Sequence, residues 1–516
     1  LGRLEDDFGL DWWELTVILV HQEIEIAFLM HLLAESLGPQ DEVHVSRPCF
    51  QADILRLALG SRVRVFASAA RRRKRGVPHY VRVFKKFPLA QLVEIFWDKT
   101  DPGYQIRGRL SGRATPQRDG VVLLPSSYVN VSRTGIAYAQ VLPETRFLLV
   151  TTRRSGWLVG LPANVSAAWL RQYASLRAKV REIEYRDLLK RWELLQNELR
   201  KTPDFRTLAQ LGTFSGFPRY FAQGLEIRDA WRNVFDSEPV QAVICADDTN
   251  PYTHIPLLLA KRRELPAIAC HHGALDGRYM FKRSHADVVL AKGRMEEDYL
   301  VRTCSLAQDR VELGAPGVLA PKRPMEKKKS VILFISEAYE VAGGRVRSFY
   351  RDILPKLADL ARSEGRELVV KLHPSESVTE RSRLVQEILS LDQFRVTRVV
   401  GGALTPEMLD RAWFGVTVLS TVAVECALRA IPCFLCAWLE AWPYGYVDQF
   451  TRFDVGIRLS GPEQLRQIPT ILQDFKASGQ IGENCWVPIE PQRLRDLLGV
   501  GVEMESPARN QVTKTA

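Results

Sequence analysis

The chain has 516 residues, which is more than one hydrophobic core usually contains, so we expect at least two domains. Hydrophobic residues make up 46% of the chain and charged residues 25%, which is typical of a folded globular protein and excludes a mainly disordered one. The net charge of +11 favours anionic partners, which include nucleic acids, anionic membranes and phosphorylated substrates. No stretch contains the roughly 18 consecutive uncharged apolar residues of a membrane-spanning helix.

The eight cysteines are not spaced like the ligands of a metal. Cys433 and Cys436 form a C-x-x-C pair, but this pair lies inside an apolar run and no second pair accompanies it. We therefore predict no metal site, and we expect the cysteines to be reduced, as in a cytoplasmic protein.

The first 66 residues alternate between strand-like and helix-like segments. We predict strands at 15–20, 42–45 and 63–66 and helices at 23–37 and 51–59. This alternation is typical of a parallel sheet covered by helices.

Residues 67–120 are basic and rich in glycine and proline, and their densest cluster is Arg71–Arg75. One interpretation is a solvated loop. The other is an attachment to the anionic inner face of a membrane, where each basic side chain contributes about 1 kcal/mol. No recognition helix, zinc finger or aromatic-plus-basic motif accompanies the cluster, so we do not expect nucleic acid as a partner.

The segment from 121 to 320 continues the strand pattern but contains a long helical interruption. Apolar runs predict strands at 121–124, 146–151, 240–246, 266–270, 288–291 and 311–313, with helices at 255–264 and 295–304 between the later ones. Residues 165–201 are polar and leucine-rich with helical spacing, which predicts one or two long helices. We interpret about 164–235 as a helical insertion packed on the sheet, with a dimerisation helix as the alternative.

A second α/β series follows a linker at 319–329 that is rich in proline and lysine. The predicted strands are 331–335, 367–372, 394–400, 415–419 and 433–435, and the predicted helices are 350–363, 381–391 and 422–429. We therefore predict an N-terminal Rossmann-like domain at 1–320, a C-terminal one at 328–500, and a disordered tail at 501–516.

Polar residues follow two predicted strands of the N-terminal half, where ligands of doubly wound sheets bind. Asp247 and Asp248 could serve as base, metal ligand or helix cap. His272 stands before a glycine and could act as a general base, although a purely structural histidine is the alternative. The loop after it carries three more polar groups, at 276, 278 and 282. Gly314 belongs to a tight turn at the expected binding edge.

The C-terminal half has two matching groups. Lys371, His373, Pro374 and Ser375 surround the end of one predicted strand, where His373 and Ser375 could face an anion.

Ser420 and Thr421 follow another predicted strand and open a helix, an arrangement that suits a phosphate but equally suits simple helix capping. Glu425 lies one turn later and could bind ribose hydroxyls. Its neighbours are apolar, so we expect this carboxylate to need a partner.

These motifs resemble those of the GT-B superfamily of nucleotide-sugar glycosyltransferases. The segment Ser420-Thr421-x3-Glu425-Cys426-Ala427-x4-Pro432 is similar to the donor-binding segment of that superfamily. Lys371-Leu372-His373-Pro374 resembles the His-Pro motif of bacterial sialyltransferases, Kdo transferases and polyol-phosphate polymerases. His272-Gly273 resembles the His-Gly motif of teichoic-acid polymerases. The chain departs from the pattern at Ile431, where the family has glycine, and at Thr421, where it commonly has a second serine.

The resemblance implies an α/β fold of two Rossmann-like domains that face a cleft. It implies that His373, Ser420 and Thr421 hold the donor phosphate, that Glu425 holds the ribose, and that Asp247 or His272 is the base. It further implies a transferase without metal or cofactor that moves a sugar from a CMP-linked or other nucleotide-linked donor. The expected acceptor is a cell-surface glycan, such as a capsule or lipopolysaccharide, or a lipid-linked precursor at the inner face of the cytoplasmic membrane. The alternatives are a sugar-nucleotide 2-epimerase, a polyol-phosphate transferase, or a non-catalytic protein that binds nucleic acid through its positive charge.

Overall fold

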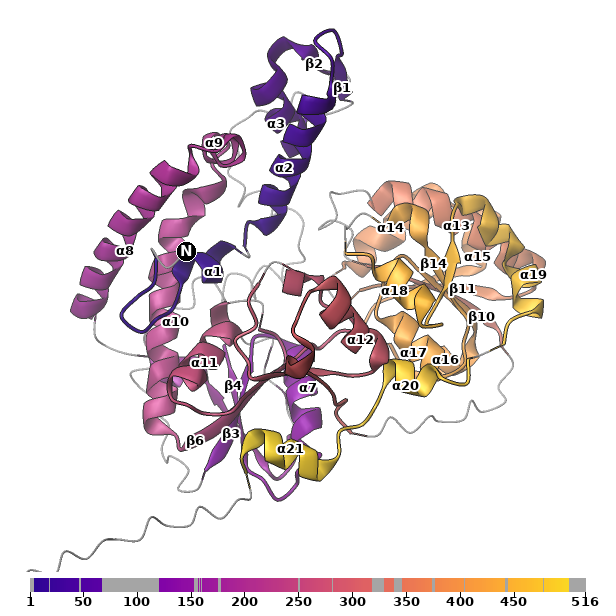
Figure 1. The fold of residues 1–516 in the computed structure, drawn as a ribbon. Helices are drawn as coiled ribbons and strands as arrows, with labels where there is room; N and C mark the ends of the chain where they lie inside the picture. The colour runs from indigo at the N-terminus through magenta and orange to yellow at the C-terminus, as the bar shows by residue number, and fades with distance from the viewer. Residues whose placement is uncertain are drawn as a thin grey trace, which may run out of the picture.

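The computed structural model describes residues 4–17, 19–45, 48–66, 120–152, 156, 158, 160–174, 178–248, 251–280, 282–317, 329–337, 346–373, 376–402, 404–440, 444–476 and 478–500. Two parallel sheets with helices around them form the two main bodies of the molecule (Figure 1). The basic cluster Arg71–Arg75, the motif residues Pro374 and Ser375, and the tail 501–516 lie outside the described residues.

The N-terminal sheet has seven strands in the order β5-β4-β3-β6-β7-β8-β9. Its strands are β3 (Val121–Ser126), β4 (Phe147–Thr151), β5 (Val165–Trp169), β6 (Val240–Cys245), β7 (Ala267–Cys270), β8 (Val288–Ala291) and β9 (Val311–Leu313). All neighbouring pairs are parallel. Every residue of β3 and β4 is buried, which explains why these strands are continuous apolar runs rather than alternating ones.

The C-terminal sheet has six parallel strands in the order β12-β11-β10-β13-β14-β15. They are β10 (Val331–Ile335), β11 (Glu367–Lys371), β12 (Thr397–Val400), β13 (Ala412–Thr417), β14 (Cys433–Cys436) and β15 (Ile457–Leu459). Numbered along the chain, the first six strands of each sheet follow the order 3-2-1-4-5-6, the doubly wound Rossmann order. The predicted fold of two Rossmann-like domains is therefore confirmed.

Helices cover both faces of each sheet. In the N-terminal body these are α7 (Val129–Ala139), α11 (Pro251–Arg262) and α12 (Arg294–Asp298). In the C-terminal body they are α13 (Val346–Ser363), α14 (Val378–Ile388), α15 (Leu391–Arg395), α16 (Pro406–Arg411), α17 (Val422–Leu428), α18 (Tyr446–Arg452) and α19 (Ile468–Gln473). The buried side of α13 includes Phe349, Tyr350, Ile353 and Leu357, which recur at helical spacing and pack on the sheet.

The first 66 residues do not extend the main sheet, contrary to our expectation. Residues 15–20, predicted as a strand, belong to and follow the helix α1 (Trp12–Val17), which packs on the helical insertion. The helices α2 (His21–Ser36) and α3 (Phe50–Leu59) follow the prediction. The strands β1 (Val43–Val45) and β2 (Val63–Val65) form a separate two-stranded sheet, which Figure 1 shows projecting from the two main bodies.

The predicted helical insertion contains α8 (Ala178–Leu199), α9 (Pro203–Gln210) and α10 (Phe217–Ser237). Residues 165–169 are not helical as predicted but form the edge strand β5, because Val165 and Ala168 bury their side chains beside β4. The rings of Trp13, Trp192 and Phe217 lie together, with the last two stacked at 4.7 Å between centroids. Within the described ranges, every helix is too short or too polar to cross a membrane.

The buried side chain of Arg228 on α10 holds the N-terminal segment against the insertion. Its guanidinium group donates to Asp6 at 2.9 Å, to Glu184 at 2.6 Å and to Asp229 at 2.7 Å. Three carboxylates around one cation satisfy its donors, so this buried charge is compensated.

The chain returns to the N-terminal body after it completes the C-terminal sheet. The amide of Ile489 donates to Ala315 at 2.9 Å, and the helix α21 (Pro491–Leu498) buries Leu494 and Leu498 in the core of the N-terminal sheet. Figure 1 shows α21 beside β3 and β6, while α20 (Ile481–Cys485) lies at α17. Residues 487–498 thus contact the N-terminal body, and the predicted domain bounds of 1–320 and 328–500 stay a prediction.

Candidate functional site

Three neighbouring strands of the N-terminal sheet end in polar residues. Tyr128 follows β3, Asp247 and Asp248 follow β6, and His271 and His272 follow β7. Because β3, β6 and β7 are adjacent and parallel, their carboxyl ends lie at the same edge of the sheet. The residues that the sequence singled out in this half are thus brought together, and Tyr128 joins them.

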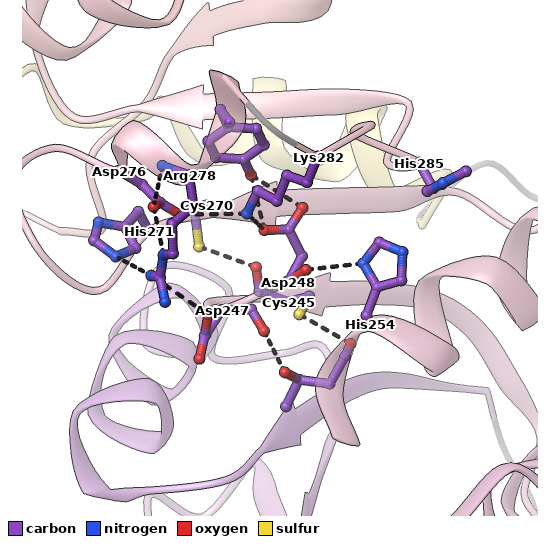
Figure 2. A network of polar contacts seen from close by, with 12 residues as sticks. Cys245, Asp247, Asp248, His254, Cys270, His271, Asp276, Arg278, Lys282 and His285 are labelled. Carbon is purple, nitrogen blue, oxygen red and sulfur yellow. Dashed lines mark hydrogen bonds and ion pairs between the residues drawn. The ribbon is translucent and has the colours of Figure 1, made fainter. Parts of the chain in front are cut away.

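Asp248 is held by two donors from the loop that follows β7 (Figure 2). The ammonium group of Lys282 contacts its carboxylate, and the hydroxyl group of Tyr279 lies 3.1 Å from each carboxylate oxygen. Asp248 is only 2% exposed. Its oxygens are thus occupied by a cation and a phenol, and the catalytic role that we predicted for Asp248 stays a prediction.

Asp276 is the second buried carboxylate of this network. It accepts from Lys282 at 3.2 Å and from the Nε of Arg278 at 2.8 Å. Burial by itself would raise the pKa of Asp276, but the charges of Lys282 and Arg278 hold this pKa well below its usual range. Burial also lowers the pKa of His271, whose Nε2 accepts a hydrogen bond from Arg278 at 3.4 Å. Both side chains thus keep one charge state at neutral pH, ionised for Asp276 and neutral for His271.

His272 contacts Tyr128 at the same edge of the sheet. The hydroxyl oxygen of Tyr128 lies 2.8 Å from Nε2 and 3.1 Å from Nδ1 of His272. Burial lowers the pKa of His272 although Asp247 opposes this change, so the ring is neutral at neutral pH and can accept a proton. Burial and the nearby Asp247 carboxylate raise the pKa of Tyr128, which therefore stays a hydrogen-bond donor.

Tyr128 was missed by the sequence analysis. It stands directly after β3 in the same way that Asp247 stands after β6, so the strand-end rule could have found it. It was overlooked because no motif surrounds it.

The ends of the strands in the C-terminal sheet are joined by two buried carboxylates. Glu376 accepts from the backbone amide of His373 at 2.8 Å, from the hydroxyl of Ser336 at 3.0 Å and from Arg381 at 2.7 Å. Glu337 accepts from the hydroxyl of Thr417 at 2.9 Å. These bonds fix the ends of β10, β11 and β13 relative to one another, which is where the sequence placed the donor site.

Two predicted binding residues at β11 have different surroundings. Lys371 is buried, and its ammonium group donates to the carbonyl groups of Leu372 at 2.5 Å and Gly402 at 2.7 Å. Lys371 thus links two backbone segments. These contacts do not test the donor-binding role that we predicted for it. The side chain of His373 is largely exposed. Its remaining burial, and to a lesser extent the charge of Lys371, lower the pKa of His373, so the imidazole is neutral at neutral pH.

Ser420 and Thr421 follow β13 and precede α17, as predicted. The hydroxyl of Ser420 accepts from the amide of Val422 at 3.3 Å, while Thr421 is exposed. Glu425 is also exposed, so the buried partner that we expected for its carboxylate is not required. Partial burial still raises its pKa, with Arg429 opposing.

The loop after β7 contacts the C-terminal body at the predicted motifs. A Cβ atom on Gly273 would lie 3.4 Å from Cγ2 of Thr421, so the Thr421 side chain lies close to the backbone of Gly273. The amide of Gly277 donates to the hydroxyl of Tyr446 at 2.7 Å, and the hydroxyl of Tyr299 donates to the carbonyl of Tyr444 at 2.8 Å. The His272-Gly273 element and the Ser420-Thr421 element therefore lie side by side. Their first residues are 148 positions apart in the sequence. The predicted cleft between the domains remains a prediction.

Gly314 lies apart from these groups. Its carbonyl accepts from Tyr138 at 2.7 Å, and a Cβ atom here would come within 3.0 Å of Ile489. Glycine thus lets the returning C-terminal segment pack closely, and the ligand contact that we predicted for Gly314 has no support in these neighbours.

Among the described residues, the side chains gathered like metal ligands are Glu14, His254 and His285. His254 and His285 lie beyond Asp248 as seen from His271, with His254 next to Asp248 (Figure 2).

Glu337 gives a prediction for the dependence of stability on pH. Burial raises the pKa of its carboxyl group from 4.5 to about 7, so the folded protein retains a proton that the unfolded chain loses in this range. The contribution of Glu337 to the free energy of unfolding should therefore be largest below about pH 4.5. It should fall by at most about 3 kcal/mol as pH rises through 7. We expect Glu337→Gln to remove this fall. The measurement is the unfolding temperature of both proteins between pH 5.5 and 8, in steps of about half a unit. If the unfolding temperatures of the two proteins fall equally with pH, the prediction is contradicted.

No protein-family model matches the chain, and no curated protein matches it. Solved structures do match. The UDP-GlcNAc 2-epimerase from Methanocaldococcus jannaschii is 10% identical, with a TM-score of 0.44 over 74% of this chain and 99% of that one. The MurG protein of Acinetobacter baumannii is 12% identical, with a TM-score of 0.40 over 74% and 98%. The wall teichoic acid polymerase TagF is 11% identical, with a TM-score of 0.40 over 80% and 98%.

The matched structures include a 2-epimerase and a wall teichoic acid polymerase. At such identities and TM-scores they do not determine the activity of this chain. The assignment of the fold rests on the strand order of its two sheets.

Proposed function

We propose that the protein is a glycosyltransferase that moves a sugar from a nucleotide-activated donor to a cell-surface glycan or a lipid-linked acceptor. The observation that carries this proposal is that the side chain of Thr421 lies close to the backbone of Gly273. It supports the proposal because Gly273 directly follows the candidate base His272, while Thr421 is a candidate phosphate-binding residue of the other domain. An acceptor hydroxyl and a donor phosphate must meet in such an arrangement for transfer to occur.

In this proposal His272 accepts the proton of the acceptor hydroxyl as that oxygen attacks the anomeric carbon of the donor. The bond from this carbon to the donor phosphate breaks, and the nucleotide leaves with the bonding electrons. The hydroxyl group of Tyr128 orients His272, whose pKa burial lowers while the nearby Asp247 carboxylate opposes this change.

The donor phosphate contacts His373, Ser420 and Thr421, and Glu425 binds the ribose. Side-chain and backbone donors can stabilise the leaving phosphate without a metal, so we propose metal-independent transfer with no cofactor. Pro374 and Ser375 complete the motif in sequence.

The acceptor class suggests where the protein works. A growing capsule or lipopolysaccharide chain, or its lipid-linked precursor, would be met at the inner face of the cytoplasmic membrane. The basic cluster Arg71–Arg75 would support peripheral attachment there through anionic headgroups. We therefore propose a cytoplasmic protein that binds the membrane surface reversibly.

Nucleotide binding gives the first test. We expect one of CMP, CDP, UDP, GDP and ADP to raise the unfolding temperature selectively, because a ligand at a hundred times its Kd stabilises the folded state by about 2.7 kcal/mol. His373→Ala and Thr421→Ala should weaken this binding at least tenfold, which is about 1.4 kcal/mol.

His44→Ala serves as the matched control, since His44 is an exposed histidine on the separate sheet β1-β2. It should leave the shift unchanged. No response of the wild-type protein to any of the nucleotides would reject the donor site. Incubation of the donor without acceptor then tests the second candidate, because inversion of the sugar at C2 would indicate a 2-epimerase instead. With an acceptor present, transfer of a polyol phosphate in place of a sugar would indicate a polyol-phosphate transferase.

A further inference from the structure

Three side chains from distant parts of the sequence converge beside Asp248. Glu14 comes from α1, His254 from α11, and His285 from the loop before β8. Oε1 of Glu14 lies 2.8 Å from Nε2 of His285 and 3.9 Å from Nε2 of His254. One ligand-type atom from each residue lies within 4.8 Å of the other two.

The tautomer of His254 is fixed by its surroundings. Its Nδ1 lies 2.8 Å from the backbone carbonyl of Asp248, which can only accept, so Nδ1 carries the proton. In the neutral imidazole with its proton on Nδ1, Nε2 carries a lone pair.

Within the described part of the chain, this Nε2 is buried and has no hydrogen-bond partner. The His254 side chain is only 6% exposed, and its Nε2 is aimed toward Glu14. Such an atom costs about 1–3 kcal/mol when nothing binds it. A histidine whose Nδ1 donates to a backbone carbonyl while Nε2 points into a cluster of carboxylate and imidazole has the arrangement of a metal ligand.

We propose that Glu14, His254 and His285 form a binding site for a divalent transition metal, with Zn²⁺ as the ion that suits them best. Two imidazole nitrogens and one carboxylate oxygen are a ligand set that zinc accepts, with bonds of about 2.0–2.1 Å. Tetrahedral bonds of that length separate ligand atoms by roughly 3.4 Å. The observed separations of 2.8 Å and 3.9 Å lie on either side of this value, so small side-chain shifts suffice.

The partial exposure of the site allows a water molecule to act as the fourth ligand. Glu14 is 18% exposed and His285 is 20% exposed, so water can reach the ion from outside. To bind zinc through Nε2, His285 gives up the proton that it donates to Glu14, and this proton passes to Nδ1 or to solvent.

The proposed site joins three segments that lie far apart in the sequence. A metal here links the N-terminal helix α1 to α11 and to the loop before β8. Through His254 it also fixes the backbone of Asp248, whose carboxylate is held by Lys282. We therefore assign the metal a stabilising role, separate from the proposed transfer, which takes place on the other side of Asp248.

Zinc binding to the full-length protein tests the proposal. After treatment with EDTA and its removal, titration with ZnSO₄ against a chromophoric chelator should give one tightly bound ion per chain. Glu14→Gln, His254→Asn and His285→Ala should each lower the affinity at least tenfold. Zinc should raise the unfolding temperature of the wild-type protein, and EDTA should reverse the rise. Co²⁺ in place of Zn²⁺ should give the visible absorption of a four-coordinate site.

The exposed pair of His44 and Glu42 is the matched control, because its Nε2 and carboxylate lie 3.0 Å apart but among the described residues no third ligand joins them. His44→Ala should leave zinc affinity unchanged. Glu14→Gln retains an acceptor for His285, so in EDTA it should unfold at the wild-type temperature. Absence of a bound ion in the wild-type protein, or affinity that survives all three substitutions, overturns the site. The nucleotide titrations of the proposed function do not depend on this outcome, so each proposal can fail alone.

Discussion

Replacement of His272 with alanine is expected to lower the turnover number by about 10²–10⁴-fold, the usual contribution of a general base. The physical reason is that burial keeps the pKa of His272 below its ordinary value, so the ring is ready to accept a proton at neutral pH. The rate of the wild-type enzyme should rise with pH through the lowered pKa of His272 and level off near neutrality. The measurement is nucleotide release from the donor that the thermal titration identifies.

The supporting variants separate catalysis from positioning. Tyr128→Phe removes the hydroxyl that contacts His272 and should shift the pH profile and lower the rate less than His272→Ala does. His44→Ala should leave the rate unchanged, since His44 lies on the separate β1-β2 sheet. The unfolding temperature of each variant shows whether the fold survives. A folded His272→Ala protein with the wild-type rate would show that another group is the base.

Replacement of Lys282 with methionine is expected to destabilise the N-terminal body by about 3–5 kcal/mol, because one partner of a buried ion pair is removed. Its ammonium group lies between the carboxylates of Asp248 and Asp276, whose side chains are 1% and 3% exposed. Without it, two buried negative charges face each other. Thermal and urea unfolding of the variant and the wild-type protein measure the loss.

The effect of acid distinguishes this mechanism from a loss of packing. The pKa of Asp276 is depressed in the folded protein, so its contribution is present above the unfolded value of about 3.9 and disappears as pH falls through the folded value. The difference in free energy of unfolding between the wild-type protein and Lys282→Met should therefore become smaller at acid pH.

A matched surface substitution controls for the loss of a lysine. Lys201→Met, at an exposed ion pair with Glu198, should change stability little at any pH. A difference between Lys282→Met and wild type that stays constant down to acid pH would indicate packing rather than charge.

The sequence by itself determined the Rossmann-like strands and much of the site. Parallel strands that are buried on both faces must be continuous apolar runs, so local composition identifies segments such as β3 and β10. Because ligands bind at the carboxyl ends of such strands, the polar residues that follow them are candidates without knowledge of the fold. This reasoning found Asp247, His272 and the Ser420-Thr421 pair, and in the structure the Thr421 side chain lies close to Gly273, the residue after His272.

Local pattern was insufficient where short segments suit both helix and strand. Residues 15–20 contain β-prone side chains, yet burial of Trp12, Leu15 and Thr16 on one side makes residues 12–17 a helix. Residues 165–169 precede a long helix and have helical spacing with it, yet pairing with β4 makes them a strand. In both cases contacts with distant segments outweigh a small local preference.

Only the tertiary structure decided which side chains share a neighbourhood. It packed Gly314 against the returning C-terminal segment and brought the Lys371 ammonium group to the carbonyl of Gly402. It also brought Tyr128 to His272 and assembled the cluster of Glu14, His254 and His285. The physical reason is the same throughout: a hydrogen bond or a metal site depends on distances between atoms, and residues hundreds of positions apart acquire those distances only when the sheets and helices pack.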